Sequence, residues 1–272
     1  MADVGARARV IVPVAAVAVE AYRAVFGRMA ILFDIAWLPL LIMLAATLLP
    51  GYLTTYLGWR ALPVWHGDNF GFGVSDVIEA VAGLLCLNAF AVRWHQRSLF
   101  SGDREPPKEI FPRAWGRFLA YTLLLYVVSA ALMSVLIVAG AQDAPPYVAP
   151  IAGLIVSLVW VGTMRCALVF PAAAYGKPIS LRAAWQLARG NTWRLFGCGI
   201  VACLPTVMAL VLVLSGIFAG LHLDQAAGKL PLGFFILRGV IGTCANFVVV
   251  ALGASVLSGF YRRIVLRGLG IF

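Results

Sequence analysis

Charged side chains are scarce in this 272-residue chain, which has 21 lysines and arginines and only 11 aspartates and glutamates. Charged residues make up 12% of the sequence, about half the share of a typical soluble protein. Hydrophobic residues make up 62%, and the mean hydropathy is +0.95. A soluble fold of this length cannot bury that much apolar surface. The composition therefore excludes a soluble protein and predicts an integral membrane protein.

Residue types that carry catalysis or bind metals are also few. There are three histidines and five cysteines, and every cysteine lies in an apolar run without the spacing of a zinc site. We interpret the cysteines as small buried residues. The sequence contains no serine-histidine-acid set, glycine-rich phosphate loop or H-E-x-x-H helix. It therefore predicts no enzymatic activity and no cofactor.

Long apolar runs are abundant, and a membrane-spanning helix needs about 20 such residues. We expect an all-α, polytopic membrane protein with one transmembrane domain over residues 1–272. The fourth of the six expected spans, which begins at Val148, could extend through Tyr175. The short run Val10–Val19 is similar to a signal peptide, but it contains Pro13, so we interpret it as an uncleaved interfacial segment. The six expected spans are Met29–Leu49, Val74–Val92, Phe118–Gly140, Val148–Thr163, Leu195–Gly220 and Leu232–Phe260.

The positive charges are distributed unevenly around these spans. Eighteen of the 21 lysines and arginines lie before the first span, after the sixth, or in the connections between the second and third and between the fourth and fifth. The other three are Arg60, Lys229 and Arg238. By the positive-inside rule, both termini are cytoplasmic in a bacterial inner membrane. This bias accounts for the net charge of +10, so we expect anionic lipid of the inner leaflet as a partner and no nucleic acid.

The stretch "SLRAAWQLARGNTWRLFG", Ser180 to Gly197, predicts a joint between two helices. Ser180 is a helix cap, and Gly190 with Asn191 can end that helix in left-handed geometry. The helix is amphipathic and suited to the membrane interface. Its apolar face carries Leu181, Ala184, Ala188 and Leu195, and its polar face carries Arg182, Gln186 and Arg189. The expected interfacial anchors are Arg28, Arg117, Arg189, Trp193 and Arg194.

Similar joints precede the first and third spans, where Arg28 and Arg117 align with Arg194. Arg93 precedes Pro106 by 13 residues, and Arg165 precedes Pro178 by the same number. We therefore predict three repeats, at about 13–100, 107–177 and 178–272. Each is a hairpin of two spans led by a cytoplasmic amphipathic helix.

The joint sequence and the six-span layout resemble a group of poorly characterised six-span bacterial inner-membrane proteins. The group includes the membrane domain that some bacteria fuse to a glycerophosphodiester phosphodiesterase. In those fused proteins a soluble domain carries out the catalysis, and the present sequence shows no such domain. The resemblance therefore implies the architecture and not phosphodiester hydrolysis.

Charged and amide side chains inside the spans are candidate functional residues. Asp34 lies roughly 9 Å deeper in the bilayer than Arg28, and Arg165 lies near the same depth. We hypothesise that Asp34 and Arg165 pair, either as a structural salt bridge or as a substrate or proton site; the alternative is that they make no contact. Asn88 and Asn246 complete this candidate polar site, and interhelical hydrogen bonding is their alternative role.

Further candidates lie toward the outer side. Asp76 and Glu79 share one face of the second span, and pairing with Arg238 of the sixth would close the bundle by joining its first and last hairpins. Two outer loops each contain a His-x-Asp motif, which is a weak candidate for a divalent metal site. Coincidental polar loops are the alternative. The four residues are His66, Asp68, His222 and Asp224.

Two features near the inner side have structural interpretations. His95 lies between Arg93 and Arg97, so we expect it in a solvated basic interface. Ala251, Ser255 and Gly259 form a row of small residues that favours close helix packing, within the bundle or between copies.

Two functions fit this architecture. The first is a transporter-like handler of lipid or small amphiphilic molecules, which predicts a groove that reaches Asp34 and Arg165. The second is a non-catalytic scaffold or accessory subunit that binds partner proteins or anionic lipid, which predicts a closed core. A membrane enzyme is a third and weaker alternative. We favour the first, because an apolar lining suits an ion or a sugar poorly. Assembly with a second copy or a membrane partner protein stays open.

Overall fold

The computed structural model describes residues 11–55, 63–67, 70–100, 110–139, 147–220 and 232–266. Within them, six helices are long and apolar enough to cross a membrane, as the sequence predicts. The chain is therefore a multi-pass membrane protein. The six are α2 (Met29–Thr55), α3 (Val74–Leu99), α4 (Ile110–Ala139), α5 (Val148–Cys166), α8 (Thr192–Gly220) and α9 (Leu232–Tyr261).

Shorter elements lie between and beside these helices. Helix α1 (Val14–Phe26) precedes α2, and α7 (Leu181–Leu187) precedes α8. After a break of two residues, α6 (Val169–Ala174) continues α5, so the fourth span extends almost to Tyr175. A π-helical turn (Arg262–Leu266) follows α9. The sequence did not predict the small antiparallel hairpin of β1 (Pro63–Gly67) and β2 (Phe70–Gly73).

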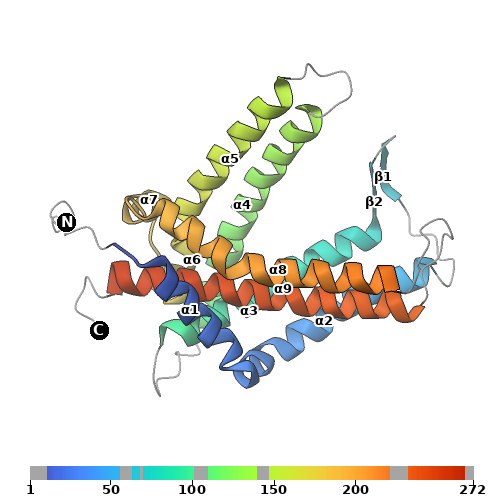
Figure 1. Ribbon diagram of the computed structural model, residues 1–272, viewed down its shortest axis with the longest axis horizontal. Coiled ribbons are helices and arrows are strands. Elements are labelled where there is room, and N and C mark those ends of the chain that lie inside the picture. The colour runs from blue at the N-terminus through green and yellow to red at the C-terminus, as the bar shows by residue number, and fades with distance from the viewer. Residues whose placement is uncertain are drawn as a thin grey trace.

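The helices form a body and a projecting arm (Figure 1). The body contains α1, α2, α3, α8 and α9, and the arm is the pair α4 and α5, which diverges from the body at a steep angle. Sequential spans contact each other as α2 with α3, α4 with α5 and α8 with α9. Helix α9 also contacts α1, α2 and α3, so it is the centre of the body.

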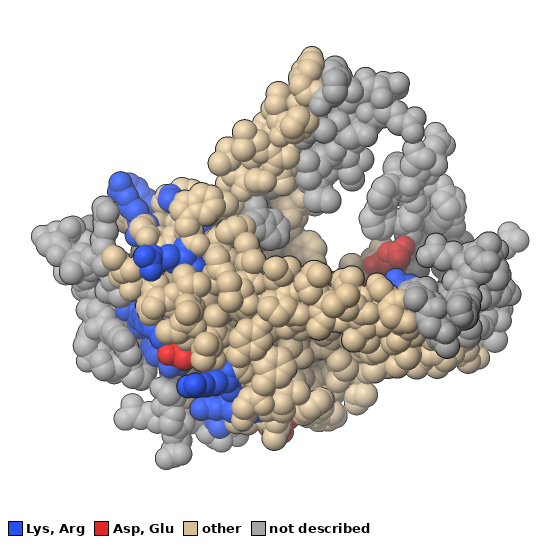
Figure 2. All heavy atoms as spheres, in the orientation of Figure 1, with Lys and Arg blue, Asp and Glu red and all other residues tan. Residues whose placement is uncertain are grey.

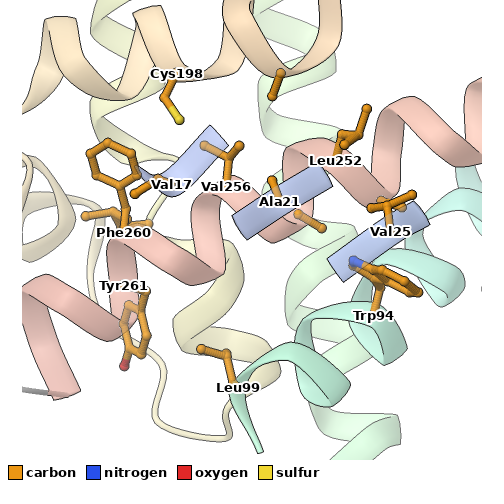
Figure 3. Packing of buried hydrophobic residues seen from close by; sticks show 14 of the residues in the cluster. Val17, Ala21, Val25, Trp94, Leu99, Cys198, Leu252, Val256, Phe260 and Tyr261 are labelled. Carbon is orange, nitrogen blue, oxygen red and sulfur yellow. The ribbon is translucent and has the colours of Figure 1, made fainter. Parts of the chain in front are cut away.

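The core forms where α1 packs against α9. Val17, Ala21 and Val25 recur every four residues, which places them on one helical face, and all three are buried. Figure 3 shows this face beside Leu252 and Val256 of α9.

The small-residue row on α9 permits the same contact. A Cβ atom added at Gly259 would lie 3.2 Å from Cγ1 of Val17. Ala251 is fully buried, and Ser255 is buried as well. The row therefore packs against helices of the same chain in this region, because α1 lies directly over its Gly259 end.

The outer surfaces of the spans are apolar and exposed. In the most apolar stretch of α8 only 6% is buried inside the protein, and Leu212 of that helix is 66% exposed. Such surfaces are stable against lipid chains or another apolar surface, and not against water. The lysines and arginines gather at the end of the molecule where the described chain starts and finishes (Figure 2).

The start of α4 differs from the prediction. We expected a separate interfacial helix before the third span, but a single helix runs from Ile110 through Arg117 to Ala139. Ala114 and Phe118 lie one turn apart on the same face, and both are buried in one cluster with Val92 of α3. That continuous buried face explains why the helix does not break at Arg117.

Candidate functional site

The joint before α8 has the predicted local structure. The Ser180 hydroxyl accepts a hydrogen bond from the Ala183 amide at 3.2 Å and caps α7. Gly190 has φ = 89°, the left-handed geometry expected at the end of the helix. Ala184, Ala188 and Leu195 are buried, whereas Leu181 is 37% exposed and departs from the predicted apolar face. Among the expected polar residues and anchors, the exposed ones are Arg28, Arg117, Arg182, Gln186, Arg189, Trp193 and Arg194.

The same joint holds the start of the described chain. The Asn191 side-chain oxygen accepts a hydrogen bond from the Val12 amide at 3.2 Å, and Arg194 donates to the Val12 carbonyl at 3.1 Å. Ten residues further along, the Tyr22 hydroxyl donates to the Ala202 carbonyl of α8 at 2.8 Å. The sequence analysis missed this function of the joint, because no local pattern connects residues about 180 positions apart.

Arg165 belongs to the joint and not to a pair with Asp34. Its Nε donates to the Thr192 hydroxyl at 2.7 Å, and its guanidinium lies 4.7 Å from the centre of the Trp185 ring. Asp34 is exposed on α2, and the ion pairs within the described ranges do not include it. The hypothesis of an Asp34–Arg165 pair is therefore wrong. Similar depth in the bilayer does not bring together α2 and α5, which lie in the body and in the arm (Figure 1).

An apolar groove of about 470 Å³ lies between α3, α4 and α9, with contributions from α2 and α6. The groove brings together Asn88 and Asn246, two of the predicted polar residues. Asn88 is buried, and its oxygen accepts a hydrogen bond from the Thr122 hydroxyl at 2.6 Å. Its amide nitrogen donates to the Leu84 carbonyl. These contacts fix the orientation of the Asn88 amide beside the exposed Asn246 side chain.

His95 lines one end of the groove and is only 2% exposed. The expectation of a solvated basic interface is wrong for this residue. Its Nδ1 is hydrogen-bonded to the Ser258 hydroxyl at 2.8 Å, and its ring lies 5.7 Å from that of Phe118. The neighbouring Trp94 donates to the Ser255 hydroxyl at 2.8 Å. Side chains three and four residues apart share a helical face, so His95 follows the buried face of α3 instead of the charged face of its neighbours.

Glu79 lines the groove as well, and it accepts a hydrogen bond from the Thr47 hydroxyl at 3.3 Å. Among the residues that the structure describes, no ion pair joins Arg238 to Glu79 or Asp76. All three side chains are exposed. The predicted closure of the bundle by an ion pair is therefore not present, although acidic and basic atoms lie near one another at the end of the molecule opposite the basic cluster (Figure 2).

A second cavity, of about 570 Å³, lies at the arginine-rich end between α1, α3 and α9 and beside the start of α2. We call it the arginine cavity, because four arginines line it. Ser255 and Ser258 of α9 also line it. The His95–Ser258 hydrogen bond joins a residue of the groove to a residue of the arginine cavity, so it lies in the wall between them.

The proposed metal ligands fall largely outside the described ranges. Asp68, His222 and Asp224 are not among the described residues, and only the backbone of His66, in β1, is described. Within the described part of the chain, no group of three or more histidine, cysteine or acidic residues is placed to hold a metal ion. Comparisons of the chain with protein-family models, with curated proteins and with solved structures find no match.

Proposed function

We propose that this membrane protein handles a lipid or another small amphiphile in the groove between α3, α4 and α9, as a transporter-like protein without enzymatic activity. The single observation that carries the proposal is an apolar groove with a group of polar side chains within it. An amphiphile matches such a surface because its chain contacts the apolar walls while its polar group binds hydrogen-bonding side chains.

The dimensions and the lining of the groove support this proposal. Glu79 and His95 mark its extent along α3, a rise of about 24 Å for 16 residues. Asn88, Thr122 and Asn246 lie between these limits and supply amide and hydroxyl groups. A path for an ion would require more charge, and Glu79 is the one acidic residue among the described residues that line the groove.

The groove differs in position from the expected one, because neither Asp34 nor Arg165 lines it. The polar part of the proposed site is therefore Asn88, Asn246 and Thr122. In the proposed orientation the arginine-rich end and both termini face the cytoplasm of a bacterial cell. In the same proposal, α1 and α7 lie at the cytoplasmic surface of the membrane and lead the first and the third repeat.

The proposal is tested by filling the groove. Gly253 lines it, and a Cβ atom added there meets no atom within 4 Å, so Gly253→Leu places a side chain in the open space. Gly242 on the same helix also has open space around it, but it does not line the groove. Gly242→Leu is therefore a matched control.

The measurement is mass spectrometry of the lipids and small molecules retained by the purified protein. We expect Gly253→Leu to retain amphiphile on the order of tenfold less than Gly242→Leu, which corresponds to about 1.4 kcal/mol of binding free energy. Equal retention by the two variants, with unchanged folding, would refute the proposed site.

The second candidate is a scaffold or accessory subunit that binds partner proteins or anionic lipid. The arginine cavity favours it, since this concave surface carries an excess of positive charge. The two candidates differ in the cavity that binds the ligand, so Gly253→Leu distinguishes them. A scaffold that binds its partner at the arginine cavity would keep its binding when the groove is filled.

A further inference from the structure

Among the described residues, the charged side chains that line the arginine cavity are mostly positive. Arg23, Arg28, Arg97 and Arg262 line it, and Glu20 is its one acidic residue within the described ranges. Glu20 already binds Arg263, with 2.6 Å between the carboxylate oxygen and the guanidinium nitrogen. That carboxylate is therefore engaged with an arginine that does not line the cavity.

Three of the four arginines form no ion pair with a described acidic residue. Arg23, Arg28 and Arg97 are exposed, and none of them forms an ion pair within the part of the chain that the structure describes. The fourth, Arg262, donates to the Ser98 carbonyl, which holds its side chain against α3. The cavity therefore combines one positioned guanidinium with three that extend from different elements: α1, the turn before α2, and the last turn of α3.

This arrangement matches the chemistry of phosphate. A guanidinium presents several N–H donors in a plane and binds phosphate oxygens in pairs. Ser255 and Ser258 also line the cavity, but their hydroxyl groups are already hydrogen-bonded to Trp94 and Ala251 and to His95, so the arginines supply the donors for a phosphate. The low-dielectric helices behind the arginines strengthen the field inside a concave site. A cavity of about 570 Å³ is also large enough for a phosphate ester and not only for the bare ion.

We propose that the arginine cavity is a binding site for a phosphate ester anion, with Arg23, Arg28 and Arg97 as the ligand-binding residues and Arg262 as a positioning residue. The phosphate belongs either to the head group of an anionic phospholipid or to a soluble phosphate ester. Basic cavities between helices at the charged end of a membrane protein bind such head groups. The proposal is independent of the amphiphile groove, because the two cavities have different linings.

The experiment compares two double variants of the full-length protein in a neutral detergent. Arg28→Gln with Arg97→Gln removes two positive charges from the cavity. Arg182→Gln with Arg189→Gln removes two exposed arginines outside it and is the matched control. Thermal unfolding is followed during titration with phosphatidylglycerol, with phosphatidylcholine and with glycerol 3-phosphate, because a ligand of the folded state raises the unfolding temperature.

We expect the cavity variant to bind the phosphate ligand on the order of tenfold more weakly, as for the loss of charge-assisted hydrogen bonds, and the control to change less than about twofold. A shift with phosphatidylglycerol alone identifies a lipid head group, and a shift with glycerol 3-phosphate identifies a soluble ester. Equal weakening of both double variants would overturn the proposal, because it indicates diffuse surface charge. If the double variant does not fold, Arg97→Gln against Arg189→Gln gives the same comparison.

Discussion

The two halves of α9 differ in how they are packed. From Ala251 to Tyr261 most residues are buried against α1, α3 and α8, whereas from Leu232 to Thr243 most are exposed or half-buried. The buried half lies at the arginine-rich end, where α1 covers it (Figure 3). The stabilising contacts are therefore concentrated at one end of the bundle, and the opposite half of α9 contributes less.

The largest effect is expected when a leucine is replaced by alanine in each half of α9. Leu252 is fully buried and Leu237 is 43% exposed on the same helix. We expect Leu252→Ala to lower the free energy of unfolding by about 2–3 kcal/mol, because the cavity loses van der Waals contacts even where lipid is as apolar as the protein interior. Leu237→Ala is expected to cost less than about 1 kcal/mol.

The measurement is unfolding in mixed micelles of increasing denaturing detergent. Equal losses for the two leucines would show that the packing of α9 is uniform along its length.

A smaller effect is expected at the contact that holds α1 on α8. Tyr22→Phe removes the hydrogen bond to the Ala202 carbonyl and should cost about 1 kcal/mol, as for other hydrogen bonds between membrane helices. Tyr126→Phe is the control in the arm, where the tyrosine is 64% exposed. The same unfolding titration applies, together with proteolysis near the start of α1. If Tyr22→Phe and Tyr126→Phe unfold and are cleaved alike, the hydrogen bond does not contribute, and α1 is held only by its buried apolar face.

The smallest effect is expected at α7, because the substitution removes only a helix cap and leaves the buried Ala184 in place. Ser180→Ala removes the helix cap and should cost about 0.5–1 kcal/mol locally. Amide hydrogen exchange in α7 should become faster by a few-fold, while exchange in α1 should stay the same. The control is Ser157→Ala, because the Ser157 hydroxyl donates within α5 to the Gly153 carbonyl and caps no helix. Faster exchange throughout the body after Ser180→Ala would contradict a local role.

The spans could be predicted from sequence because their signal is local. Twenty consecutive apolar residues identify a spanning helix without any knowledge of its neighbours. The cap at Ser180 and the left-handed Gly190 are equally local. The start of α4 at Ile110 was missed, because hydropathy does not register an amphipathic turn that packs through Ala114.

The contacts between spans could not be predicted in the same way. Depth in the bilayer follows from position in the sequence, but the direction that a side chain faces depends on which helices are neighbours. Asp34 and Arg165 illustrate the failure, since one is exposed and the other binds Thr192. Asn88 and Asn246 line one groove, and its position between α3, α4 and α9 could not be read from the sequence. The burial of His95 had a signal in the sequence. His95 follows Asn88 by seven residues, or two helical turns, so both side chains lie on the same face of α3, and both are buried.

The arm of α4 and α5 has a mechanical consequence. Phe118 is buried near the base of α4, whereas Val127 further along it is 67% exposed. From Phe118 to the end of α4 at Ala139 the helix rises about 32 Å, so a rotation of about 5° at Phe118 would move the far end by about 3 Å. Phe118, Thr122 and Tyr126 of α4 form one side of the groove, so a rotation about the contact between the Phe118 and Phe170 rings, whose centres lie 4.6 Å apart, would change the width of the groove.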